Sequence, residues 1–308
     1  MFFEVRRLGI IAALAGAACV ADSPQAATTS RAIVVVDDAG DTVQLAAPAR
    51  RAISLIPSAT ETIIALGAVD RLVGRTRYDV APQVEELPSV GGGIDPSFEA
   101  IVALRPDLVI GWDSDKRRTT RLKLGALGIP VFSLRTQDTA DVFHGIGSLG
   151  RLFGRDSAAA ALVGSIRAKI VGVRAAVAGL PTRRVLFVVY PDPPMTVGHD
   201  TFIDELIGTA GGSSIFSESP KPWPTVTMEE IIRRNPDLII LPQGEFTANA
   251  LSQFRQRPGW RDLTAVRNGS VATVPADLTQ RPGANIGDGA IALEFAIHPE
   301  LRHTGARR

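Results

Sequence analysis

Short apolar runs rich in β-branched residues alternate along the chain with segments whose apolar residues recur every three or four positions. The first pattern is typical of buried strands, and the second of helices that pack on one face. Strands are predicted in the first half at 52–56, 72–73, 108–110 and 131–134, and in the second half at 185–190, 238–241 and 271–274. Helices are predicted at 61–66, after Asp95-Pro96, at 122–127, at 202–207, before Pro236 and at 286–297. This alternation predicts an α/β fold with parallel sheets and helices on their faces.

A longer helix is predicted between the two halves. Residues 156–177 contain no proline, and their apolar side chains Leu162, Ile166, Ile170 and Val173 recur at helical spacing. At 1.5 Å per residue, such a helix would extend about 33 Å. The predicted organisation is an N-terminal α/β lobe over 27–155, a linker helix over 156–180 and a C-terminal α/β lobe over 181–308.

One stretch occurs twice, once in each half. FEAIVALRPDLVIGW starts at Phe98 and MEEIIRRNPDLIILP starts at Met228, so that matching residues are 130 positions apart. In both copies a helix is predicted to end before a proline, because the residue before proline avoids helical angles, and Pro-Asp-Leu then leads into a strand. The sequence also predicts capping boxes at 58–61 and 227–230 and an aspartate cap at Asp95.

The first residues differ in composition from the rest of the chain. Arg6 and Arg7 precede an apolar stretch at 8–20, which is shorter than the roughly 20 residues that a membrane-spanning helix needs. This layout predicts a secretory signal peptide over 1–26. Cys19, the only cysteine, leaves two alternatives open: acylation as in a bacterial lipoprotein, with the chain anchored through this residue, or cleavage near Ala21 or Ala26 without a lipid. A single cysteine excludes a disulfide framework.

Composition and motifs exclude several classes of protein. With 45% apolar and 21% charged residues the chain is globular, and a net charge of +1 without a basic stripe gives no indication of nucleic-acid binding. A secreted enzyme is a further class, but the sequence lacks a Gly-x-Ser-x-Gly elbow, a His-Glu-x-x-His motif and a Gly-Lys-Ser phosphate loop. Four histidines and one cysteine are few for a dedicated zinc site. The sequence therefore predicts no enzymatic activity, no catalytic residues, no cofactor and no metal site.

Several segments resemble one known family. RAISLIPSATETIIALGAVDRLVG, YDVAP and GGGIDPSFEAIVALRPDLVI are similar to the N-terminal lobe of the periplasmic binding proteins for iron–siderophores, haem and cobalamin. PPMTVGHDTFIDELIGTAGGSSIF and KPWPTVTMEEIIRRNPDLIIL are similar to the cobalamin-binding members, and the resemblance extends over residues 51–297. It implies a bulky ligand held in a cleft between the lobes, a periplasmic location, and delivery to the permease dimer of an ABC importer in the inner membrane.

The resemblance implies that Glu99 and Glu229, which occupy matching places in the two copies, dock on arginines of the two permease halves. An exposed carboxylate facing arginine forms paired, charge-assisted hydrogen bonds, and two such points fix orientation. The alternative is an acid that stabilises a helix start through the helix dipole. Glu230 fits this alternative better, because it holds the capping-box place after Thr227. Glu229 is thereby left free.

Three aromatic residues are candidate ligand contacts. Trp223 is flanked by two prolines, which favour a stiff loop, and Trp112 follows strand 108–110 at the carboxyl edge where ligands of α/β sheets gather. Tyr78 lies in a stretch that the family uses to line its cleft. The ring faces could cover a corrin ring, and ionised Tyr78 could ligate haem iron, as the resemblance implies for some relatives. Core packing, or a ring that caps the sheet, is the alternative for each.

Polar and sulfur-bearing candidates are less specific. Met195 and His199 flank Val197-Gly198 in the loop after strand 185–190, and either could contact the ligand, although a lone exposed histidine more often contacts neither ligand nor metal. The candidate cations of the cleft are Arg75, Arg77 and Arg281. If these arginines converge, they favour an anionic ligand such as an iron–siderophore; if they point outward, they are solvated charges.

The chain departs from the cobalamin-binding members at one place. Where those proteins have a tryptophan before the acidic docking helix, this chain has Gly91-Gly92-Gly93. We expect the triplet to remove one aromatic wall and to widen the site. Two cargoes therefore remain open: cobalamin or a related corrinoid, and an iron–siderophore or haem on the same scaffold.

Overall fold

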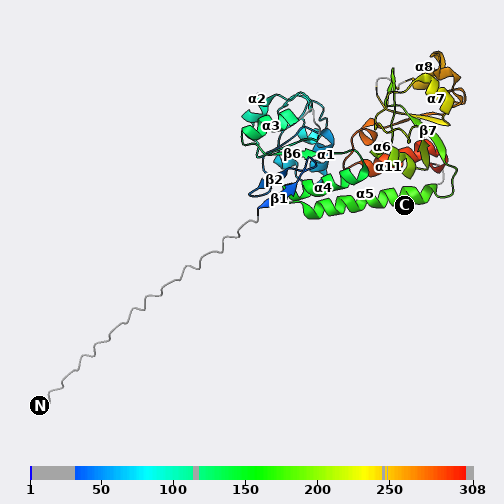
Figure 1. Ribbon diagram of the computed structural model, residues 1–308. Helices are drawn as coiled ribbons and strands as arrows, with labels where there is room; N and C mark the ends of the chain where they lie inside the picture. Colours follow the sequence, from blue (N-terminus) through cyan, green and yellow to red (C-terminus); the bar gives the residue numbers. More distant parts are fainter. Residues whose placement is uncertain (2–31, 114–117, 245–246, 248, 303–308) are drawn as a thin grey trace. The chain divides into compact units, whose positions relative to one another are not determined.

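The computed structural model describes residues 1, 32–113, 118–244, 247 and 249–302. The predicted signal peptide and Cys19 lie outside the described residues. From Ala32 onward the chain forms one compact unit that contains two parallel sheets (Figure 1). No helix in these described ranges is both long enough and apolar enough to cross a membrane.

The N-terminal lobe is built on four parallel strands in the order β4-β3-β5-β6. Its strands are β3 (Ala52–Ser54), β4 (Leu72–Gly74), β5 (Leu108–Trp112) and β6 (Val131–Leu134), and its helices are α1 (Pro57–Ala65), α2 (Phe98–Ala103), α3 (Arg118–Ala126) and α4 (Thr139–Phe153). An antiparallel hairpin of β1 (Ile33–Val36) and β2 (Thr42–Leu45) packs against α4. The sheet is buried on both faces, because Ala52 and Leu108 point into one apolar cluster while Ile53 and Val109 point into another.

The C-terminal lobe repeats this plan with the order β10-β7-β11-β12. Its strands are β7 (Arg183–Phe187), β10 (Gly212–Ser214), β11 (Leu238–Pro242) and β12 (Val271–Val274), beside a short ribbon of β8 (Tyr190–Pro191) and β9 (Pro194–Met195). Its helices are α6 (Phe202–Thr209), α7 (Met228–Arg234), α8 (Ala250–Gln256), α9 (Thr264–Arg267), α10 (Ala276–Thr279) and α11 (Ile286–Ile297). In each four-stranded sheet the second strand in the sequence forms the edge beside the first strand. The third and fourth strands follow in order on the opposite side of the first strand. The predicted class, two α/β lobes with parallel sheets, is confirmed.

Helix α5 (Asp156–Val177) connects the lobes as one uninterrupted helix, as predicted. It packs against α4 on one side and α11 on the other. Ile166, Ile170 and Val173 of the predicted apolar stripe are buried, and Leu162 packs partly buried against the same core. That core is a single cluster of side chains that continues from the first lobe through α5 into the second. A continuous helix with a buried stripe therefore makes a stiff connection between the lobes.

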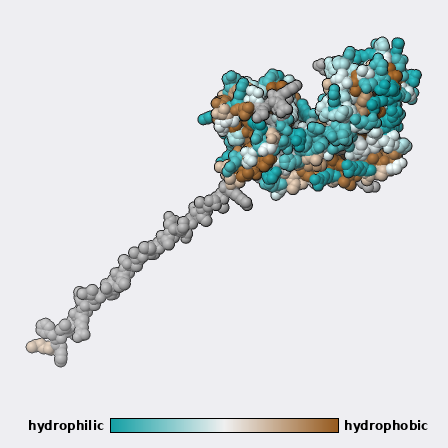
Figure 2. Space-filling view, viewed as in Figure 1, coloured by the Kyte–Doolittle hydropathy of each residue, from teal (hydrophilic) through white to brown (hydrophobic). Residues whose placement is uncertain are grey.

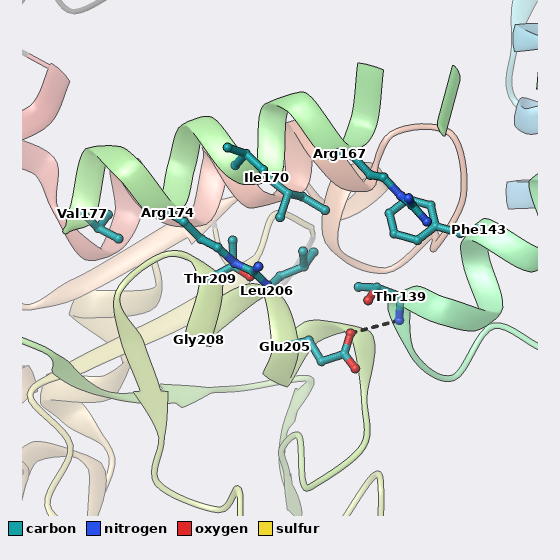
Figure 3. A pocket seen from close by; sticks show the side chains of 11 residues that line it. Thr139, Phe143, Arg167, Ile170, Arg174, Val177, Glu205, Leu206, Gly208 and Thr209 are labelled. Carbon is teal, nitrogen blue, oxygen red and sulfur yellow. Dashed lines mark hydrogen bonds between the residues drawn. The ribbon is translucent and has the colours of Figure 1, made fainter. Parts of the chain in front are cut away.

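The first residue of α4 and the loop before it make a second connection to the C-terminal lobe. Phe202 at the start of α6 donates its backbone N–H to the carbonyl oxygen of Gln137 at 2.7 Å, and the Thr139 N–H donates to Glu205 Oε2 at 3.0 Å. Figure 3 shows the Thr139–Glu205 bond at the edge of a groove of about 820 Å³ that runs beside α5. These hydrogen bonds thus add to the connection that α5 makes between the lobes.

The repeated Pro-Asp-Leu segment forms the same corner in both lobes. The carboxylate of Asp107 accepts the backbone N–H of Arg51 at 3.0 Å, and the carboxylate of Asp237 accepts that of Arg184 at 2.9 Å. The Arg51 guanidinium then donates to the carbonyls of residues 104 and 105, and the Arg184 guanidinium to those of 234 and 235. Each arginine thus satisfies the free carbonyls at the end of α2 or α7. The repeat recurs because both lobes fix a helix to the first strand of their sheet in this way.

Two predicted helix caps are wrong and one is confirmed. The capping box at 58–61 is absent because α1 begins at Pro57, ahead of the predicted cap, and Ser58 is buried inside the helix. Helix α2 is capped by Ser97, whose Oγ accepts the Ala100 N–H, while Asp95 binds Arg77 instead. The box at 227–230 forms as predicted, with Thr227 and Glu230 bonding each other's backbone N–H.

Candidate ligand site and docking helices

Tyr78 is held on a turn of the N-terminal lobe by buried polar groups. Asp79, which is buried, accepts hydrogen bonds from the Thr76 N–H and the Thr76 hydroxyl, both at 2.7 Å. The Thr76 hydroxyl oxygen in turn accepts the Tyr78 N–H at 3.2 Å. This network fixes the backbone while the Tyr78 side chain stays 52% exposed. Tyr78 therefore presents a phenol ring on a rigid turn.

The three predicted cleft arginines are all engaged. Arg77 bonds both carboxylate oxygens of Asp95, and its guanidinium lies 5.2 Å from the centre of the Tyr78 ring. The hydrogen bond from Arg77 lowers the pKa of the Asp95 carboxyl. Arg75 donates to the backbone carbonyls of Glu85 and Thr76. Arg281 is paired with the Glu61 carboxylate, so an anionic ligand would have to compete with existing partners.

Arg281 joins the two lobes at the Tyr78 turn. Its Nη1 donates to Glu61 Oε1 on α1 at 2.6 Å, and its Nη2 donates to the Tyr78 carbonyl at 3.4 Å. Two residues on, Gly283 lies so close to α1 that a Cβ atom there would be 2.8 Å from the Ser58 carbonyl oxygen. Burial raises the pKa of Glu61, although the hydrogen bond from Arg281 and its charge act in the opposite direction. Sequence reasoning missed Glu61 because it assigned this residue to a helix cap.

Trp223 lies in a loop that is hydrogen-bonded to the segment 196–198 through the residues on either side of the tryptophan. Pro222 and Pro224 accept backbone N–H groups from Gly198 at 2.9 Å and Thr196 at 3.0 Å. A Cβ atom on Gly198 would lie 2.1 Å from the Lys221 carbonyl oxygen, so glycine permits this close approach. The Trp223 side chain is 42% exposed. A stiff loop with an uncovered indole is the arrangement that the flanking prolines predict.

Met195 and His199 lie on the segment that borders the Trp223 loop. Met195 belongs to β9 and is half-buried. Its backbone pairs with that of Thr225 in a single antiparallel β-bridge. The imidazole of His199 is exposed, and its Nε2 lies 2.9 Å from Asp200 Oδ1. Among the described residues no group of three or more His, Cys, Asp or Glu side chains is arranged to hold a metal ion. Trp223, Met195 and His199 thus belong to one surface region of the C-terminal lobe.

Trp112 and the glycine triplet pack against each other. A Cβ atom on Gly93 would lie 2.8 Å from Trp112 Cζ3 and 2.2 Å from the Leu55 carbonyl oxygen. Trp112 is partly buried and packs on the core of the lobe. The triplet therefore lets the backbone approach this ring closely.

A hollow separates the two lobes on the surface. Figure 2 shows it with mainly hydrophilic side chains along its floor. The Arg281–Glu61 pair spans the two lobes beside Tyr78, while the Trp223 region belongs to the C-terminal lobe alone.

Glu99 and Glu229 are exposed in the first turns of α2 and α7. Hydrogen bonds from its own backbone N–H and from the Ser97 hydroxyl lower the pKa of the Glu99 carboxyl. Glu230 is used in the capping box, whereas Glu229 has no hydrogen bond or ion pair with any described residue. Glu229 is therefore available for an external partner.

Comparison with known proteins identifies the class. Residues 53–278 match the model of the periplasmic binding protein family, and the chain belongs to that family. It is 29% identical over 275 residues to an uncharacterised ABC transporter substrate-binding lipoprotein, YvrC, of Bacillus subtilis, covering 87% of this chain and 86% of the relative. It is 28% identical to a vitamin B12-binding protein of Vibrio cholerae, covering 76% of this chain and 84% of the relative.

Two solved structures show the same architecture. The periplasmic vitamin B12 binding protein of Vibrio cholerae superposes with a TM-score of 0.71 at 26% identity, covering 83% of this chain and 99% of that one. A protein of an Fe³⁺-hydroxamate transport system from Saccharomonospora viridis gives 0.70 at 26% identity, covering 88% and 99%. The chain is thus a substrate-binding protein of the ABC transporter class, whose named relatives are transport proteins rather than enzymes.

Proposed function

We propose that this protein captures cobalamin or a related corrinoid in the periplasm and delivers it to the permease dimer of an ABC importer in the inner membrane. The predicted signal peptide is the basis for the location, and the predicted lipid on Cys19 would add an anchor. Glu99 and Glu229 would dock on the two permease halves. The ligand would lie between the lobes, in contact with Tyr78, Trp112 and Trp223.

The observation that carries this proposal is a pair of half-exposed aromatic rings on rigid loops, one from each lobe. Tyr78 and Trp223 are 52% and 42% exposed, although apolar ring faces gain free energy when they are covered. A corrin is a broad ring system whose faces could cover both. Met195, His199 and Arg281 would contribute peripheral contacts. Two relatives that match most of the chain are named for vitamin B12 and for cobalamin.

An iron–siderophore or haem is the second candidate cargo. The similarity to an Fe³⁺-hydroxamate transport protein favours it, and the Tyr78 phenol could bind ferric iron directly. The arginines give it less support, because Arg75, Arg77 and Arg281 each have a partner within the protein. An anionic cargo would have to displace these partners.

The test mixes the purified protein with cyanocobalamin, haemin or a ferric hydroxamate siderophore, and then removes free ligand by desalting. We expect the cobalamin absorbance to stay with the protein at about one equivalent. The Tyr78→Phe variant separates the candidates, because it keeps the ring face but loses the phenolate. It should retain cobalamin, whereas iron ligated by Tyr78 would be lost. Retention of haemin or siderophore alone would contradict the corrinoid proposal, and a chemically altered ligand would indicate an enzyme.

A further inference from the structure

Each docking helix exposes a β-branched aliphatic side chain three residues after its exposed first-turn glutamate. Val102 on α2 is 40% exposed, and Ile232 on α7, 130 positions later, is 41% exposed. The preceding residues in the two helices, Ile101 and Ile231, are both 0% exposed. The two helices are therefore oriented alike: matching positions are buried against the core in both, and matching positions are exposed in both.

The glutamate and the aliphatic residue lie on one side of each helix. Residues three apart in a helix are neighbours on its surface. Glu99 with Val102, and Glu229 with Ile232, thus form two small patches, each of one carboxylate and one branched aliphatic side chain. The Asp107 and Asp237 corners fix α2 and α7 to their sheets in the same manner, so both patches have a rigid base.

A single exposed aliphatic residue is ordinary on a protein surface and indicates nothing by itself. The recurrence is the informative feature, because other positions of these helices have diverged. Ala100 corresponds to Glu230, and Ala103 to Arg233. The carboxylate and the exposed β-branched residue, by contrast, keep their chemical character in both helices. A partner that binds both patches by the same contacts must itself have two copies of the complementary surface.

We propose that Val102 and Ile232 are apolar docking contacts that act together with Glu99 and Glu229 on a two-fold permease dimer. This inference rests on the docking part of the proposed function and adds the chemistry of the partner. Each permease half would offer a cation to the glutamate and, one helical turn away, an apolar recess to the aliphatic side chain. The carboxylates complement cations of the partner, while the aliphatic side chains lose their contact with water on docking.

The two kinds of contact should affect different rate constants. Charges at the edge of an interface mainly steer association and make it dependent on salt. Covered apolar side chains mainly slow dissociation. Loss of the aliphatic side chains should therefore raise the dissociation rate at every salt concentration and leave the association rate nearly unchanged.

The experiment measures binding of the full protein to the permease–ATPase complex of its own importer, held in lipid nanodiscs on a biosensor surface. Val102→Ser and Ile232→Ser should each raise the dissociation rate about fivefold, and the double variant about 25-fold. The exchange Val102→Ile with Ile232→Val keeps the apolar surface and should dissociate like the wild type. Val171→Ser is the matched control, since Val171 is 62% exposed but lies on α5.

Charge reversal distinguishes failure of this inference from failure of the proposed docking. Glu99→Lys with Glu229→Lys should abolish association at low salt. If this variant loses docking while the Val102 and Ile232 variants dissociate like the wild type, the proposal of aliphatic contacts is wrong and the docking role of the glutamates is retained. If the charge-reversed protein docks normally, both the proposed docking surface and this inference are wrong. Melting temperature and ligand binding, measured for each variant, show that the fold is intact.

Discussion

Arg281 Nη1 lies 2.6 Å from Glu61 Oε1 and thereby connects the segment after α10 in one lobe to α1 in the other. Both side chains are mostly buried, with 27% and 19% of their side-chain surface exposed. The same arginine bonds the carbonyl of Tyr78. A single guanidinium therefore links the two lobes and the turn that carries a candidate ligand contact.

The free energy of unfolding should depend on the ionisation of Glu61. Burial raises its pKa above the ordinary value of 4.5. A carboxyl whose pKa is raised by folding contributes stability below the ordinary pKa, and this contribution is lost as the pH rises through the raised value. Arg281→Ala removes the interactions that lower this pKa, so the loss should become larger. We expect the variant to be destabilised by about 1–3 kcal/mol at pH 7.5, and by clearly less at pH 4.

Urea unfolding of the wild type and Arg281→Ala at both pH values provides the measurement. The control makes Arg281→Ala in a Glu61→Gln background, which has no carboxyl to ionise at this place. Measured against the Glu61→Gln single variant, the effect of Arg281→Ala should be nearly the same at pH 4 and pH 7.5. An equal effect of Arg281→Ala at both pH values would show that the charge of Glu61 contributes nothing.

Removal of the Trp223 ring should weaken ligand binding without affecting the fold. Trp223→Ala removes an exposed indole whose contact with a ligand face we expect to be worth about tenfold in Kd, and Trp223→Phe should restore part of that loss. Leu127→Ala serves as the control, because Leu127 is a 59% exposed apolar residue in the other lobe. Isothermal titration with the retained ligand gives the Kd values. An unchanged Kd for Trp223→Ala would remove this residue from the site.

Elements with a strong local pattern were predictable from the sequence. The α5 helix has no proline and a regular apolar stripe, and β12 is a β-branched run; both have the predicted bounds, Asp156–Val177 and Val271–Val274. Helix α4 was missed. It contains three glycines, which lower helix propensity, and it is stabilised by packing on α5. Local propensity did not indicate that tertiary contact.

Interactions between distant residues were beyond the reach of sequence patterns. The spacing of 58–61 fits a capping box, but Glu61 bonds Arg281, 220 positions away. Asp95 has the right place for a helix cap, but it pairs with Arg77 across 18 positions. In both cases a local motif competes with a charged partner supplied by the fold. The box at 227–230 formed, with its acidic member bonded locally to Thr227.

Both repeated corners should contribute to stability. Asp107→Asn replaces a carboxylate that accepts the N–H groups of Arg50 and Arg51, and Asp237→Asn replaces one that accepts the N–H of Arg184, each at the start of a central strand. An amide keeps one acceptor oxygen but turns an N–H group toward the donors. We expect each variant to lose about 1–2 kcal/mol in urea unfolding, with the loss at Asp107 at least as large because it accepts one more N–H group. Glu86→Gln, at an exposed carboxylate with no described partner, should change nothing. A large effect in only one lobe would contradict the equivalence of the corners.

Gly93 lies directly against the Trp112 ring. Gly93→Ala would place a Cβ atom 2.2 Å from the Leu55 carbonyl oxygen and 2.8 Å from Trp112 Cζ3, and backbone cannot yield to such an overlap without moving the loop. We expect a loss of about 1–3 kcal/mol in stability and a shift in tryptophan fluorescence as the Trp112 ring is displaced. Gly125→Ala is the matched control, since a Cβ atom on this glycine of α3 would meet nothing within 4 Å. If Trp112 contacts the ligand, Gly93→Ala also weakens binding; if the ring only caps the sheet, the fluorescence shift occurs with the Kd unchanged. A Gly93→Ala variant with normal stability and fluorescence would show that the triplet is not required for this packing.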